Sequence, residues 1–338
     1  MADLDLATSL NRRRALVLTG GATGGLVLTG KAVSAGIIPP RDVTIPSRDG
    51  ALTLAADTAG AAGLPVQQIE SILQGPGTVS NGVLSISMSR TDLGTVKGPL
   101  GVPFEGPFEL NFDIYFQSLG RNKAILNGDV TLKPNEVNPF IDAIIKNGLV
   151  FQAYHQHYIE ENPQTWHIHF RGLGGPLDLA RGLHDAIKTA TSTPLPQKAG
   201  STSTPLNADK LGQILGGDAS VDDGVVSVEV PRKNRIRLGG VLISPFLNVA
   251  TSIQIKPLNN SGSKAAVAPD FSMTADEVVP VTRLMRSLGW FDGCLYNQET
   301  DEQPQLYFSH MLKVGDPYAL AREVRRALDL TNSEGASA

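Results

Sequence analysis

The sequence has one cysteine, Cys294, among 338 residues, so it can form no internal disulfide and holds no CxxC motif for zinc or redox chemistry. We expect Cys294 to be a small buried apolar residue. The sequence also has no excess of positive charge: 29 Lys and Arg against 33 Asp and Glu give a formal net charge of -4. No basic stripe interleaved with aromatic residues occurs, and we therefore expect no nucleic-acid partner.

Long hydrophobic runs are missing too. The apolar stretch 15–30 is Gly-rich and shorter than the roughly 20 strongly apolar residues that a membrane-spanning helix needs. It follows Asn11-Arg12-Arg13-Arg14 and precedes Val33-Ser34-Ala35, an order typical of a twin-arginine export signal cleaved after Ala35. A disordered basic tail is the alternative interpretation.

The location that we predict follows from this signal. Residues 1–35 would be the export signal and residues 36–63 an N-terminal extension, so the protein would be periplasmic or extracellular. No cysteine lies directly after the apolar stretch 15–30. We therefore expect no lipid anchor at that point, no transmembrane segment in the mature chain, and a soluble protein once the signal is removed.

What the sequence does contain is an internal duplication. Glu136-Val137-Asn138-Pro139 recurs as Glu277-Val278-Val279-Pro280. The same separation of 141 residues relates four further pairs: Gly148 and Gly289, Pro163 and Pro304, His169 and His310, and Gly174 and Gly315. We expect one domain to be present twice.

The predicted domains are repeat 1 at 64–190 and repeat 2 at 206–331, with a Ser/Thr/Pro-rich linker at 191–205 and a tail at 332–338. In repeat 1 apolar residues alternate as in strands and then recur at helical spacing. The strands expected are 83–88, 110–116, 124–132, 149–158 and 165–171, and the helices begin near 134 and 176. This order predicts an α+β fold: two tandem copies, each an antiparallel sheet with two helices on one face, related by pseudo-two-fold symmetry.

Four of the six histidines gather on the two strands of one hairpin: His155, His157, His167 and His169. Residues two apart in a strand point to the same face, so each pair can direct two imidazoles at one point. We expect His155 opposite His169 and His157 opposite His167. All four rings would then lie on the face away from the helices, and Tyr154, Trp166, Ile168 and Phe170 would be buried on the other.

Such a cluster is typical of a metal site. Three or four neutral imidazoles can bind one transition-metal ion, and zinc, copper, iron and nickel all remain open. The alternative is a set of exposed or hydrogen-bonded sheet histidines without a metal.

Repeat 2 cannot hold the same metal alone, because Tyr296, Gln298 and Phe308 replace three of these histidines and only His310 is kept. Since its equivalent face has become partly apolar, we expect the two sheets to pack face to face, with repeat 2 closing one side of the site. His310 would then either reach the cluster or be a packed core histidine.

Several carboxylates recur or lie close to the cluster in the sequence. We interpret Glu136 and Glu277 as helix caps, with a metal-ligand or base role for Glu136 as the alternative. Asp129 and Asp270 recur on the preceding strand, where we expect a turn or cap role. Glu160 and Glu161 belong to the hairpin loop and are candidates for a general base.

These motifs together resemble the LppY/LpqO-like family: the Glu-Val-Asn-Pro helix start, the His-x-His strand, the strand ending in His169 and the Gly-Leu-Gly-Gly-Pro turn at 172–176. The resemblance spans about residues 64–330. It implies an exported bacterial protein with paired domains of no established function. By this resemblance His155, His157 and His169 are the characteristic histidines, whereas His167 stands where a Tyr is expected.

The sequence therefore predicts an exported metal-binding protein that uses the histidine cluster of repeat 1. Whether it is a metal-dependent enzyme acting on a small molecule is open, and so are its catalytic residues and its oligomeric state. The alternative is a non-catalytic envelope protein that binds a ligand and no metal.

Overall fold

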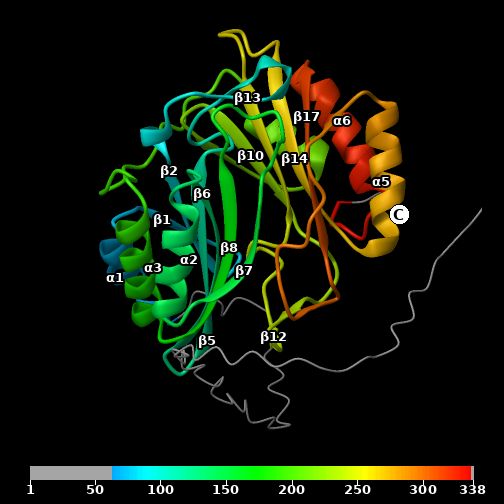
Figure 1. Cartoon of the computed structure of the whole chain (residues 1–338). Helices are drawn as coiled ribbons and strands as arrows, with labels where there is room; N and C mark the ends of the chain where they lie inside the picture. Colours follow the sequence, from blue (N-terminus) through cyan, green and yellow to red (C-terminus); the bar gives the residue numbers. More distant parts are fainter. Residues whose placement is uncertain (1–62, 336–338) are drawn as a thin grey trace, which may run out of the picture. The chain divides into compact units, whose positions relative to one another are not determined.

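The computed structural model describes residues 63–335, which include both repeats (Figure 1). The expected export signal, 1–35, and the extension up to residue 62 lie outside the described residues. Within the described part of the chain, no helix is both long enough and apolar enough to cross a bilayer.

Repeat 1 forms a six-stranded antiparallel sheet in the order β1-β2-β5-β6-β8-β7. Its strands are β1 (Gly77–Ser80), β2 (Val83–Ser89), β5 (Asn111–Gly120), β6 (Lys123–Leu132), β8 (Trp166–Gly174) and β7 (Val150–His155). The β2–β5 connection holds the short strands β3 (Val96–Lys97) and β4 (Pro103–Phe104) and the 3₁₀ turns η1 (Thr91–Leu93) and η2 (Pro99–Gly101).

Repeat 2 builds the same sheet again, in the order β9-β10-β13-β14-β17-β15. Its strands are β9 (Asp218–Asp222), β10 (Val225–Val230), β13 (Thr251–Pro257), β14 (Ala265–Met273), β17 (Tyr307–Gly315) and β15 (Phe291–Asp292). A small additional sheet joins β12 (Val241–Leu242), β11 (Arg237–Leu238) and β16 (Glu302–Gln303). The duplicated antiparallel architecture predicted from the sequence is thus confirmed.

Each sheet has helices on one face. The two expected helices of each repeat are α2 (Val137–Lys146) and α3 (Pro176–Ala190), and α5 (Ala275–Ser287) and α6 (Pro317–Leu328). A short helix that we did not expect precedes each sheet, α1 (Val66–Leu73) and α4 (Ala208–Leu215). Figure 1 shows α1, α2 and α3 side by side against the first sheet. Helix α1 contacts α3, and helix α4 contacts α6.

The alternation of side chains in the central strands separates two kinds of face. On β8, Ile168 and Phe170 belong to the core between the sheet and the helices, whereas His167 and His169 point to the other side. The prediction for Tyr154 is wrong: its side chain is 54% exposed, because it lies near the end of edge strand β7.

The faces without helices pack against each other. Two apolar clusters contain residues of both repeats: one includes Phe104 and Tyr158 with Ala266 and Leu312, and the other includes Ile125 with Phe308. Both faces are therefore removed from water, and the polar side chains between the clusters lie in a dry interface.

Candidate metal centre

The hairpin register differs from the one expected. His155 pairs with His167, and Ala153 rather than His155 pairs with His169. β7 has a bulge between Phe151 and Ala153 and ends at His155, so His157 lies beyond the strand. The observed register differs from the expected one by two residues, and the histidines therefore keep the same face.

The imidazole rings contact one another across the two repeats. The ring of His157 stacks on His167 and on His310, with centroid distances of 3.3 and 3.6 Å. His155 stacks on Tyr296 at 3.5 Å and lies 5.2 Å from His169. Repeat 2 thus closes one side of the cluster, as predicted, and its His310 is part of the cluster.

Most nitrogens of these rings are buried without a hydrogen-bond partner. Among the described residues, both ring nitrogens of His155 and of His169 have none, and neither has Nε2 of His157 or of His167. A buried polar atom left unpaired destabilises a fold by about 1–3 kcal/mol. Six such nitrogens at one place therefore need a ligand or a functional explanation.

Glu109 orients His157. Its Oε2 atom lies 2.8 Å from Nδ1 of His157, which leaves Nε2 of that ring directed into the cluster. Burial, together with the charges of nearby carboxylates, raises the pKa of Glu109 well above its ordinary value. Glu109, which lies just before β5 and outside the strand expected at 110–116, was not singled out from the sequence.

Asp129 holds His167 and His169 in a similar way. Its Oδ2 lies 3.4 Å from Nδ1 of His167, and its unpaired Oδ1 lies 3.9 Å from Nε2 of His169. Burial would raise the pKa of Asp129, but these two histidines outweigh burial and hold the pKa below its usual value. The expected turn or cap role is wrong, because Asp129 lies inside β6 and the equivalent Asp270 inside β14.

Burial keeps the rings in the form that binds metals. Desolvation, followed by the charges of neighbouring imidazoles, lowers the pKa of His155, His157 and His310 well below the ordinary value. Desolvation also lowers the pKa of His169. Neutral imidazole is the metal-ligating state of histidine.

Within residues 63–335, three groups of side chains could hold a metal ion, each with its ligand atoms within 4.8 Å of one another. They are His155, Cys294 and His310; Glu109, His157 and His310; and Asp129, His157 and His167. Cys294 is therefore more than the small apolar residue that we expected: it is half-buried, and its Sγ lies 3.3 Å from Nδ1 of His310.

The other carboxylates singled out in the sequence have different partners. Glu136 accepts from the backbone N–H of Lys133 and from the guanidinium of Arg90, both at 2.9 Å, but its side chain makes no capping hydrogen bond to α2. The capping role holds for Glu277, which forms a capping box with Thr274. In the hairpin loop Glu160 is exposed, whereas Glu161 is buried and accepts from the hydroxyl of Thr165. Burial raises the pKa of Glu161, and the nearby His167 opposes this.

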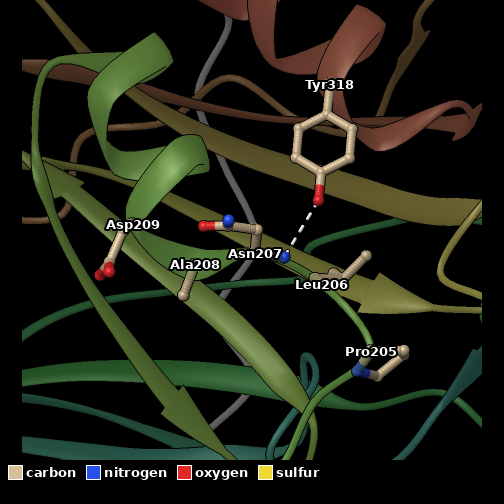
Figure 2. Close-up of a pocket in the computed structure, with 6 residues that line it drawn as sticks. All are labelled: Pro205, Leu206, Asn207, Ala208, Asp209 and Tyr318. Carbon is tan, nitrogen blue, oxygen red and sulfur yellow. Dashed lines mark hydrogen bonds between the residues drawn. The ribbon is translucent and has the colours of Figure 1, made fainter.

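Two surface hollows lie away from the histidines. One surrounds the start of α4, where the hydroxyl of Tyr318 accepts from the backbone N–H of Asn207 at 3.0 Å (Figure 2). The other lies beside α1 and is lined by Glu70, Gln74 and their neighbours. Neither hollow gathers the titratable groups that the histidine cluster has.

Comparison with known proteins adds the family. A family model described as Domain of Unknown Function (DUF1259) matches residues 67–189 and again residues 209–330. No curated protein and no solved structure matches the chain. Since the two matches coincide with the two sheets and together cover more than half of the sequence, the chain belongs to this family and carries its domain twice.

Proposed function

We propose that this protein binds transition metal through the histidine cluster between its two sheets. The observation that supports this best is the set of six buried ring nitrogens without a partner among the described residues. A bound ion would accept the lone pairs that no protein donor meets, and it would account for a cluster that otherwise destabilises the fold.

The proposed ligands are His155, His157, His167 and His169. Glu109 and Asp129 serve as the carboxylates that fix the ring orientation, an arrangement common around metal-bound histidines. Repeat 2 contributes His310, whose ring stacks on His157.

The donor types point to the class of ion. Imidazole nitrogens with a thiol at the border suit zinc, copper, iron or nickel, whereas magnesium and calcium prefer sets made of oxygen atoms.

A catalytic role would use the same residues. An ion at this place can polarise a small-molecule substrate or lower the pKa of a bound water. Glu161 is the proposed general base for the bound water, because it is buried and the nearby His167 lowers its pKa against the effect of burial. The site would act after export, as the Asn11–Arg14 motif and the resemblance to the LppY/LpqO-like proteins suggest.

The test is elemental analysis of the untagged full chain beside a His155→Ala/His157→Ala variant. At least one equivalent of a transition metal in the wild type, lost in the variant, supports the proposal. His184→Ala is the matched control, because His184 lies on α3 next to Gln74, away from the cluster. A wild-type protein that carries no metal and takes none up would overturn the proposal, and would favour an envelope protein that binds a small-molecule ligand without metal.

A further inference from the structure

The cluster offers more ligands than one ion can use. Five imidazoles, one thiol and the Asp129 carboxylate meet there. A zinc ion in proteins takes about four ligands, and one or more of these is often water in a catalytic site. With a single ion bound, several of the six unpaired ring nitrogens would stay buried without a partner.

Two of the three ligand groups share no residue, and the third, Glu109 with His157 and His310, takes one ring from each of them. His155, Cys294 and His310 form one set, here called the thiol set, and Asp129, His157 and His167 form the other, here called the carboxylate set. Within each set the three ligand atoms lie within 4.8 Å of one another. We infer that the site holds two transition-metal ions, one in each set; this inference rests on the metal binding proposed above.

The two sets adjoin. His157 of the carboxylate set stacks on His310 of the thiol set at 3.6 Å. His169 lies between them, 5.2 Å from the ring of His155 and with its Nε2 3.9 Å from Oδ1 of Asp129. Both nitrogens of His169 are unpaired, although this ring belongs to none of the three ligand groups.

The sets differ in chemistry and in origin. The thiol set offers sulfur and two nitrogens and spans both repeats, whereas the carboxylate set offers one oxygen and two nitrogens and belongs to repeat 1 alone. Sulfur favours zinc or copper(I), and the oxygen-containing set also suits iron. When an ion binds the thiol set, the Cys294 thiol loses its proton to solvent and binds as thiolate.

Cobalt(II) titration of the chelator-treated, untagged full chain tests this inference, because thiolate ligation gives a charge-transfer band in the near ultraviolet. The wild type should take up two equivalents and show the band. Cys294→Ser should keep one ion and lose the band. His157→Gln/His167→Phe should keep one ion together with the band, and it installs the residues that repeat 2 has at these places, Gln298 and Phe308.

The outcomes separate the two proposals. Two equivalents in the wild type and one in each variant support a two-ion site. A single equivalent in the wild type overturns it and leaves the metal-binding proposal standing, whereas no uptake at all overturns both. Since the stoichiometry of the wild type alone decides between one ion and two, the test still holds if a variant fails to fold, and His184→Ala should still bind two ions.

Discussion

Replacing His155 by leucine should stabilise the metal-free protein and reduce the stabilisation that metal binding adds. Both ring nitrogens of His155 are buried and unpaired among the described residues, none of whose carboxylates lies within ion-pair distance of this ring. Its packing partner is Tyr296, on which it stacks at 3.5 Å. Leucine fills the place of the imidazole with an apolar side chain of similar size and removes both unpaired nitrogen atoms.

The magnitude follows from these contacts. Relief of two unpaired nitrogens is worth about 2–6 kcal/mol, and loss of the stacked pair costs about 0.5–1.5 kcal/mol, so the metal-free variant should gain roughly 0.5–5.5 kcal/mol. At about 2–4 °C per kcal/mol, its melting temperature should rise by several degrees. Saturating metal, at about 100-fold the dissociation constant, stabilises the wild type by about 2.7 kcal/mol.

The assay is thermal unfolding followed by circular dichroism, with chelator and then with added zinc, for the wild type, His155→Leu and His184→Leu. Added zinc should raise the melting temperature of the wild type by more than it raises that of His155→Leu, so the advantage of the variant over the wild type should shrink or reverse. His184→Leu should gain nothing in either condition. If metal-free His155→Leu melts below the wild type, the ring nitrogens are satisfied without metal and the reasoning is refuted.

Three further predictions concern neighbouring groups. Glu136→Gln should lose about 3–5 kcal/mol in denaturant unfolding, because it breaks a buried pair with Arg90, and elemental analysis should find its metal content unchanged. Glu109→Gln should weaken metal affinity by about 10–100-fold in a chelator competition, since the hydrogen bond between Glu109 and His157 fixes the orientation of that ring. Burial raises the pKa of Glu229 to about 7, so the folded state holds this proton more tightly than the unfolded chain. Stability should therefore fall by up to about 3 kcal/mol as pH rises from about 4.5 to about 7, and urea unfolding of Glu229→Gln across this range should show a flatter curve.

Periodicity predicted the strands and the longer helices because each has one face against a large apolar core. The strand expected at 124–132 is β6, and the helix expected from 176 is α3. Helix α1 escaped notice because only Ile69 and Leu73 of its eight residues are buried, too few to establish a period. The hairpin register was predicted wrongly by two residues, because alternation in the sequence indicates the face of each strand and not which residues pair.

The candidate site was predictable only as far as one hairpin. His155 and His169 share a strand pair, so spacing alone brings them together. Cys294 and His310 reach the cluster because two sheets pack face to face, a contact between residues about 140 positions apart that no local pattern encodes. The recurrence of His310 at the place of His169 was the signal available, and it was compatible with a core role as well.

The loss of three histidines from repeat 2 has a physical reason in this packing. If both repeats had kept them, eight imidazoles would face one another in a dry interface, each unpaired nitrogen destabilising the fold by about 1–3 kcal/mol. Instead Phe308 joins an apolar cluster, Gln298 donates to the carbonyl of Asn248, and Tyr296 stacks on His155. Repeat 2 thus surrounds the site with apolar side chains and with polar side chains that have hydrogen-bond partners. The residues that it adds to the ligand groups are Cys294 and His310. Because the two copies differ, the interface between them buries one cluster of five imidazoles and one thiol instead of eight facing imidazoles.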